Sequence, residues 1–139
     1  MKYMLAPGAT APTRATEGSA GYDLTASEST PLYPGHRAIV STGVSLQLPE
    51  GLAASVRPRS GLAAKHGITV LNTPGLVDPD YRGEIKVILY NTSDRFFMVN
   101  RGDRIAQLTF EHFLTPNLEQ VDDLDHTERG TGGFGSTGR

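Results

Sequence analysis

The chain has 139 residues, a formal net charge of −2 and no cysteine, so we expect one domain with a true hydrophobic core and no disulfide framework. No apolar run approaches the ~18 residues of a membrane span, and no block of basic residues favours binding of long nucleic acid. The first residues, MKYMLAPGATAPTR, lack the apolar stretch of a signal peptide, and together with the absence of cysteine this predicts a cytoplasmic protein.

The predicted elements are short strands separated by turns, in keeping with 16 Gly and 9 Pro residues. Among these strands, residues 83–91 give the strongest pattern, because Ile85, Val87 and Leu89 share one face. A short helix is predicted over residues 60–67, with Ser60 as its candidate cap. In chain order the apolar patterns predict strands over residues 37–41, 43–49, 52–57, 83–91, 95–100 and 101–110, which favours a β sandwich or barrel.

The C-terminal part of the chain differs in composition from the rest. Residues 1–117 form the predicted β body, and residues 118–128 form an acidic, solvated tether. Residues 129–139 form a glycine-rich arm in which Phe134 is the one large apolar side chain. An arm of this composition cannot fold by its own packing, because glycine loses the most backbone freedom on ordering.

Two interpretations of the arm stay open at this point. It is either a disordered terminus or a lid that becomes ordered on a phosphorylated aromatic ligand. Glycine N–H groups can cradle phosphate oxygens, aided by the hydroxyls of Ser136 and Thr137 and the charges of Arg129 and Arg139, and an aromatic ring can stack on a flat ligand. The superficial match to G-x-G-x-x-G is rejected, because that motif needs a following helix to hold the phosphates.

Two clusters within the β body carry side chains suited to chemistry. Arg59, directly after a predicted strand, is either a phosphate ligand or a surface residue beside the helix cap. In residues 71–84, Pro74-Gly75 fits the centre of a type II turn. Asp78 follows as either a general base that activates water or a carboxylate that satisfies turn amides.

Five segments in order resemble the five motifs of the trimeric dUTPases, the deoxyuridine 5′-triphosphate nucleotidohydrolases. They are GYDLTAS, RPRSGLAAKHGI, GLVDPDYRGEIKVILYN, RGDRIAQL and RGTGGFGSTG, and they span residues 21–138. The resemblance implies an all-β, jelly-roll-like β barrel in a homotrimer whose C-terminal arm is exchanged to a neighbouring subunit. It also implies Mg²⁺-dependent hydrolysis of dUTP to dUMP and pyrophosphate, which removes dUTP from the nucleotide pool and supplies dUMP for dTTP synthesis.

The resemblance assigns expected roles to individual residues. Asp78 is the expected general base, which orients water toward the α-phosphate, and Asp23 is expected to hold magnesium through water. Tyr81 is the ring expected to pack on the deoxyribose and exclude a 2′-hydroxyl. The other expected substrate contacts are the uracil-reading hairpin residues Asn72, Gly75, Leu76, Val77 and Lys86, the phosphate ligands Arg59, Ser60, Gly61 and Gln107, and, from the arm, Arg129, Phe134, Gly135 and Ser136.

Two alternatives to a dUTPase remain. A dCTP deaminase shares the fold, but residues 71–81 contain no Glu for the required proton shuttle and position 61 is Gly. A nucleotide-gated protein-interaction module would use the same β trimer, with its arm gripping a protein partner.

Overall fold

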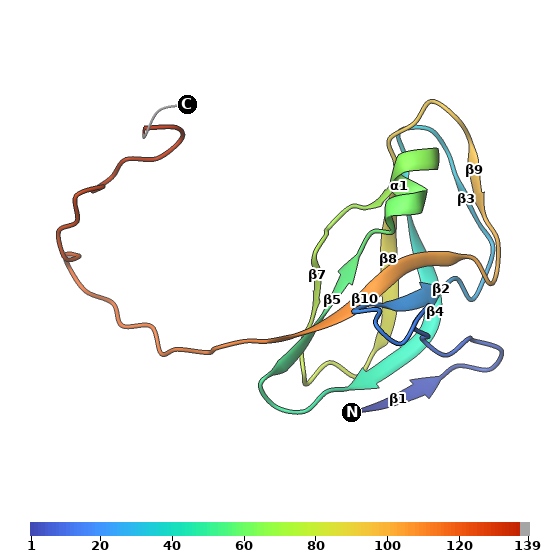
Figure 1. Cartoon of the computed structure of the whole chain (residues 1–139), viewed down its shortest axis with the longest axis horizontal. Helices are drawn as coiled ribbons and strands as arrows, with labels where there is room; N and C mark the ends of the chain where they lie inside the picture. Colours follow the sequence, from blue (N-terminus) through green and yellow to red (C-terminus); the bar gives the residue numbers. More distant parts are fainter. Residues whose placement is uncertain (137–139) are drawn as a thin grey trace.

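The computed structural model describes residues 1–136, which form ten strands and one short helix (Figure 1). The expected contributions of Thr137 and Arg139 lie outside the described residues. The elements are β1 (Lys2–Leu5), β2 (Tyr22–Thr25), β3 (Thr30–Leu32), β4 (Arg37–Gln47), β5 (Leu52–Arg57), α1 (Ser60–His66), β6 (Ile68–Val70), β7 (Gly75–Val77), β8 (Glu84–Asn91), β9 (Phe97–Val99) and β10 (Arg104–His112).

The strands pair antiparallel in two four-stranded sheets and one two-stranded sheet. The strand orders are β1-β4-β8-β6, β2-β10-β5-β7 and β3-β9. Side chains from both large sheets belong to one buried cluster, for example Val40 and Val87 from the first and Val56 and Leu108 from the second. The two sheets therefore cover the two sides of a single core, and the predicted all-β, jelly-roll-like body is confirmed.

The strand β8 follows the predicted alternation. Ile85, Val87 and Leu89 are buried, while Lys86 between them is exposed. It lies between β4 and β6 in the sheet, and against β4 it places Ile88 opposite Ile39 and Val87 opposite Val40. This pair of long strands anchors the first sheet, and β8 carries one wall of the site described below.

The strand β4 differs from the sequence-based prediction, which divided it at Thr42-Gly43. It is one strand with a register shift between Ser41, which faces Lys86, and Ser45, which faces Glu84. Gly43 adopts a φ of 69°, which favours glycine. The buried Thr42 hydroxyl donates to the main-chain oxygen of Ile85 at 2.6 Å. The register shift is thus a β-bulge within one continuous strand, and the Thr42 side chain stabilises it by hydrogen bonding to β8.

The helix α1 was predicted correctly, but its cap was not. Arg59, in an extended conformation, is the N-cap residue, and no side chain caps the first turn, so Ser60 is the first helical residue and not the cap. The Arg59 side chain points instead to the Asp23 and Arg104 region. Gly67 ends the helix in the left-handed conformation, with φ 66° and ψ 24°, as glycine commonly does.

The segment after β10 leaves the body and runs away from it as an extended trace (Figure 1). Residues 113–136 contain no helix or strand, and residues 118–128 are exposed throughout. Phe134 is fully exposed. Within residues 1–136, no helix has the length and apolar character needed to cross a membrane.

Candidate active site

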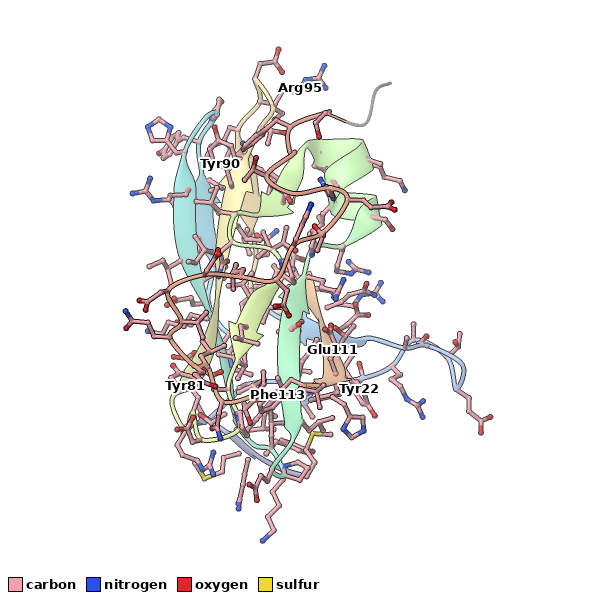
Figure 2. All side chains as sticks on the ribbon, turned by 90° about the vertical axis from the view of Figure 1, so that its left-hand side faces the viewer. Tyr22, Tyr81, Tyr90, Arg95, Glu111 and Phe113 are labelled. Carbon is pink, nitrogen blue, oxygen red and sulfur yellow. The ribbon has the colours of Figure 1, made fainter. Side chains whose placement is uncertain are left out.

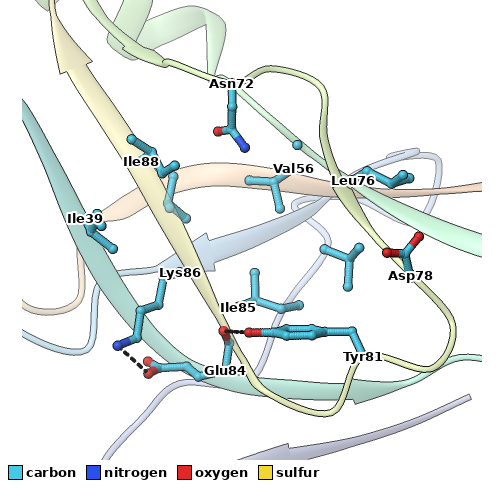
Figure 3. A pocket seen from close by; sticks show the side chains of 13 residues that line it. Ile39, Val56, Asn72, Leu76, Asp78, Tyr81, Glu84, Ile85, Lys86 and Ile88 are labelled. Carbon is cyan, nitrogen blue, oxygen red and sulfur yellow. Dashed lines mark hydrogen bonds and ion pairs between the residues drawn. The ribbon is translucent and has the colours of Figure 1, made fainter.

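A pocket of about 650 Å³ opens between β7 and β8 (Figure 3). It brings together Asp78, Tyr81 and the five residues expected in the uracil-reading hairpin. Apolar side chains of both sheets complete its lining. The lining residues are Ile39, Val56, Asn72, Gly75, Leu76, Val77, Asp78, Tyr81, Glu84, Ile85, Lys86, Val87 and Ile88.

The strand β7 forms one wall and is an edge strand. It pairs only with β5 in its sheet, with Gly75 opposite Val56 and Val77 opposite Ala54. One side of its backbone therefore carries N–H and C=O groups that no neighbouring strand of the described sheet uses. Such groups can hydrogen-bond the edge of a planar ligand.

The turn before β7 is not the predicted type II turn. The Thr73–Pro74 peptide bond is cis, and Gly75 does not adopt the positive φ that a type II turn requires. Gly75 instead begins the strand, and its lack of a side chain serves close packing. A Cβ there would lie 3.1 Å from Nδ2 of Asn72 and 3.5 Å from Cβ of Val56.

Asp78 lies at the rim of the pocket, just after β7. The main-chain N–H of Tyr81 donates to the carbonyl oxygen of Asp78 at 3.2 Å, which closes a turn through Pro79 and Asp80. Within residues 1–136, the carboxylates of Asp78 and Asp80 accept no hydrogen bond and join no ion pair. The Asp78 carboxylate is therefore free to accept a proton from water, and it does not satisfy turn amides.

Tyr81 crosses the lower part of the pocket, with its hydroxyl donating to the main-chain oxygen of Glu84 at 3.0 Å (Figure 3). The residue is 47% exposed and lines the pocket, so part of its ring is open to a ligand. Lys86 lies on the next exposed position of β8, and its Nζ is 3.6 Å from Oε2 of Glu84. Glu84 was not among the predicted site residues.

A second cluster of charged residues lies at the other end of β5. Asp23 on β2 is buried, and its Oδ2 accepts a hydrogen bond from Nη1 of Arg104 at 3.1 Å. The Nε of Arg59 lies 3.0 Å from Oδ1 of Asp23, and its Nη1 donates to the main-chain oxygen of Arg104 at 3.0 Å. Gln107 stands opposite both Asp23 and Arg57 across the sheet. Four residues, from the two strands β2 and β10 and from the N-terminus of α1, thus converge.

Ser60 and Gly61 occupy the exposed first turn of α1, beside Arg59. A Cβ on Gly61 would meet no atom within 4 Å, so the space over this turn is open to a ligand. Arg104 was missed by the sequence analysis. Its link to Asp23 depends on the pairing of β2 with β10, which no local pattern reveals.

The Oδ1 atom of Asp23 is a buried acceptor without a hydrogen bond. Arg59 is close, but its N–H does not point at this oxygen, so the pair is electrostatic only. An unused carboxylate oxygen fits a hydrogen bond from water on a magnesium ion. Within residues 1–136 no group of three or more His, Cys, Asp and Glu side chains could hold a metal directly. Magnesium keeps several waters and prefers phosphate oxygens, so an indirect contact through Asp23 fits its chemistry.

One chain does not bring the two clusters together. The register places Asp78 beyond the Ala54 end of β5, whereas Arg59 lies beyond the Arg57 end. At ~3.3 Å per strand residue this is a separation of roughly 13 Å or more. Tyr81, which precedes β8, is labelled in the lower part of Figure 2, and Tyr90, near the end of β8, is labelled in its upper part.

The predicted arm residues also lie away from the pocket of their own chain. The Nε of Arg129 donates to the carbonyl oxygen of Gly132 at 2.8 Å, within the arm itself. Phe134 and Gly135 both adopt positive φ, and Ser136 is exposed. None of these four residues lines the pocket between β7 and β8.

Comparison with known proteins identifies the family. The family model described as dUTPase matches residues 8–138. The deoxyuridine 5′-triphosphate nucleotidohydrolase of Wolinella succinogenes is 55% identical over 135 residues, covering 97% of this chain and 91% of that protein. The protein of the same name from Paramecium bursaria Chlorella virus 1 is 50% identical over 134 residues, covering 96% and 94%.

The fold agrees with this relationship. The G164S mutant dUTPase of Staphylococcus bacteriophage 80alpha, solved with dUpNHpp, superposes with a TM-score of 0.88 at 27% identity. The superposition covers 99% of this chain and 98% of that chain. The pocket between β7 and β8 and the cluster around Asp23 agree with these similarities. Together they show that the chain belongs to the dUTPase family.

Proposed function

We propose that this chain hydrolyses dUTP to dUMP and pyrophosphate. The observation that carries this proposal is the free Asp78 carboxylate at the rim of a pocket that also holds Tyr81 and an unpaired strand edge. In the proposed reaction Asp78 accepts a proton from a water molecule as that water attacks the α-phosphorus. The bond from the α-phosphorus to the bridging oxygen breaks, and pyrophosphate leaves.

The pyrimidine binds along β7. Main-chain groups of Gly75, Leu76 and Val77 on the open edge, with the Asn72 amide, hydrogen-bond the uracil edge. A base with a different donor and acceptor pattern leaves these groups unmatched, which is a strong basis for rejection. A methyl group is rejected by lack of space, and that kind of misfit typically discriminates by only ~10–200-fold.

The triphosphate binds to the second cluster. Arg59 and Gln107 supply charge and hydrogen bonds, and Ser60 and Gly61 supply donors at the open first turn of α1. Bound magnesium would neutralise charge on the phosphates, and Oδ1 of Asp23 would accept a hydrogen bond from its water. Lys86 adds a further positive charge from the pocket wall.

The active form is proposed to be a homotrimer. The separation of Asp78 from Arg59 along β5 supports a site in which the pocket of one subunit meets the phosphate cluster of another. Residues 118–128 act as an acidic tether, and residues 129–139 act as an arm that closes over a neighbouring site. In that arm Phe134 stacks on the uracil and Arg129 contacts the γ-phosphate, while Gly135 and Ser136 add further phosphate contacts.

The proposed assembly has a direct test. Light scattering coupled to size-exclusion chromatography is expected to give three times the mass of the chain. Truncation before Arg129 is expected to leave the trimer and its unfolding midpoint unchanged while nearly abolishing turnover, because residues 113–136 contribute no strand or helix to the body. A truncated protein with full turnover would show that the arm is dispensable.

The activity is tested by pyrophosphate release from dUTP, dTTP, dCTP and UTP with Mg²⁺, alongside an assay for ammonia. We expect release from dUTP and no ammonia from dCTP, since ammonia would indicate a deaminase. Asp78→Asn is expected to lower kcat by ~10²–10⁴-fold, the usual contribution of a general base, while retaining binding of dUpNHpp. Asp80→Asn is the matched control, because Asp80 shares the turn but does not line the pocket. Unchanged turnover in Asp78→Asn would reject the proposed base.

A further inference from the structure

The Tyr81 ring rests on a bare stretch of backbone at Gly83. A Cβ added to Gly83 would lie 2.6 Å from Cζ and 2.9 Å from Cε2 of Tyr81, and closer still to the hydroxyl oxygen. Gly83 does not adopt a positive φ, so the backbone itself does not demand glycine there. The absence of a side chain at this position therefore serves the ring of Tyr81.

The tip of the same ring is held by Glu84. The Tyr81 hydroxyl donates to the main-chain oxygen of Glu84 at 3.0 Å, as drawn in Figure 3. The ring is thus located at two points, by contact at Gly83 and by a hydrogen bond at Glu84. Nearly half of the residue is exposed and it lines the pocket, so these two contacts, more than burial, fix where the ring lies.

The main chain of Glu84 is in turn anchored to β4 by its own carboxylate. Oε1 of Glu84 accepts a hydrogen bond from the N–H of Gly43 at 2.8 Å, and Gly43 lies in the β-bulge. The Thr42 hydroxyl holds Ile85, the next residue of β8, at 2.6 Å. Two side-chain hydrogen bonds therefore fasten the start of β8 to the bulge, and β-bulges next to binding sites commonly aim a side chain.

We propose that Gly83 and Glu84 are positioning residues that seat the Tyr81 ring and thereby set the discrimination between dUTP and UTP. This inference rests on the proposed function, in which Tyr81 packs against the sugar. An ordinary carbon contact needs 3.4–4 Å, so an alanine at position 83 displaces the ring by about 1 Å. A displacement of that order is enough to change a rate by ~10²-fold when it moves a group that orients substrate.

The experiment measures the ratio of kcat/KM for dUTP to kcat/KM for UTP in Gly83→Ala, Glu84→Ala and Glu84→Gln. Gly83→Ala is expected to lower this ratio about tenfold or more with an unfolding midpoint close to wild type. The reason is that the new methyl meets the movable end of a side chain and not backbone. Gly18→Ala is the matched control, because a Cβ there meets nothing within 4 Å.

Glu84 is tested by rescue and by a double-mutant cycle. Glu84→Gln keeps an oxygen that can accept the Gly43 N–H and is expected to retain the ratio, whereas Glu84→Ala is expected to lower it several-fold. In a Tyr81→Phe background, Glu84→Ala is expected to have no further effect, because the hydroxyl through which it acts is gone. A general structural role would instead lower the ratio equally in both backgrounds.

The outcomes separate the two proposals. A wild-type protein that releases no pyrophosphate from dUTP overturns the proposed function, and this inference with it. A wild-type protein that prefers dUTP, together with Gly83→Ala and Glu84→Ala variants that keep the wild-type ratio, overturns this inference alone. If Gly83→Ala does not fold, the Glu84 and Tyr81→Phe cycle still decides the matter.

Discussion

Replacing Thr42 by Val tests whether hydrogen bonds of the Thr42 hydroxyl stabilise the β-bulge of β4. Thr42 is fully buried, and its hydroxyl donates to the Ile85 carbonyl at 2.6 Å and accepts from the N–H of Val44 at 3.2 Å. Valine has nearly the same shape but can make neither bond. The substitution therefore removes hydrogen bonding at the bulge without opening a cavity.

The expected loss follows from these two bonds. A buried hydrogen bond contributes about 1 kcal/mol net, and a buried partner left unsatisfied costs ~1–3 kcal/mol. The gain from the more apolar methyl offsets part of this, so we expect the unfolding free energy to fall by about 2 kcal/mol. For a domain of this length, each kcal/mol lost lowers the Tm by roughly 4 °C, so we expect the Tm to decrease by about 8 °C.

The assay is urea and thermal unfolding followed by circular dichroism at one fixed protomer concentration, because assembly makes stability concentration-dependent. Thr42→Ser is the control, since it keeps the hydroxyl and loses one methyl group worth about 0.8 kcal/mol. The expected order of stability is wild type, then Thr42→Ser, then Thr42→Val. A Thr42→Val protein at least as stable as Thr42→Ser would refute the assignment of the bulge to these hydrogen bonds.

Further predictions concern the core, the cluster around Asp23 and the surface. Gly43→Ala is expected to destabilise more than Thr42→Val in the same urea assay, because φ is 69° and the new methyl overlaps Cβ of Ala9. Leu89→Ala, at a buried position of β8, is expected to lower the unfolding free energy by ~3–5 kcal/mol in that assay. Asp23→Asn is expected to raise the magnesium concentration that gives half-maximal pyrophosphate release, measured by metal titration. Finally, the Arg57 guanidinium lowers the pKa of the exposed Glu111 carboxyl below its usual 4.5. The stability from this pair is thus present above pH 4.5 and lost as the pH falls through the lowered pKa. Glu111→Gln is therefore expected to make the urea midpoint of unfolding depend less on pH over that range.

Local patterns predicted the elements whose cause is local. The alternation of residues 83–91 became β8, and Gly67 ended α1, since burial on one face and a left-handed glycine each act within a few residues. The division of β4 at Thr42-Gly43 was wrong because the bulge is closed by Glu84, 41 residues later in the chain. The cap of α1 was wrong because Arg59 is held by Asp23, which no local signal connects to it.

The candidate site shows the same division between local and non-local causes. The residues of the hairpin from Asn72 to Lys86 were predicted as a set, and the structure brings them around one pocket. Arg104 was overlooked because its pairing with Asp23 depends on the register of β2 against β10. Glu84 was overlooked for a different reason: its importance comes from two contacts, with Gly43 and Tyr81, that belong to separate strands and turns.

An edge strand is a weakness in most β proteins, because its unused N–H and C=O groups invite pairing with another chain. Here β7 is only three residues long and is followed directly by Asp78-Pro79, so it offers little for another strand to extend. The same unused groups suit the edge of a pyrimidine. If the base is recognised by main chain, as proposed, a side-chain substitution other than to proline leaves the recognising groups in place. Selectivity in this pocket is then adjustable mainly through the residues around the strand, and Gly83 and Glu84, which contact the Tyr81 ring and its hydroxyl, are two such residues.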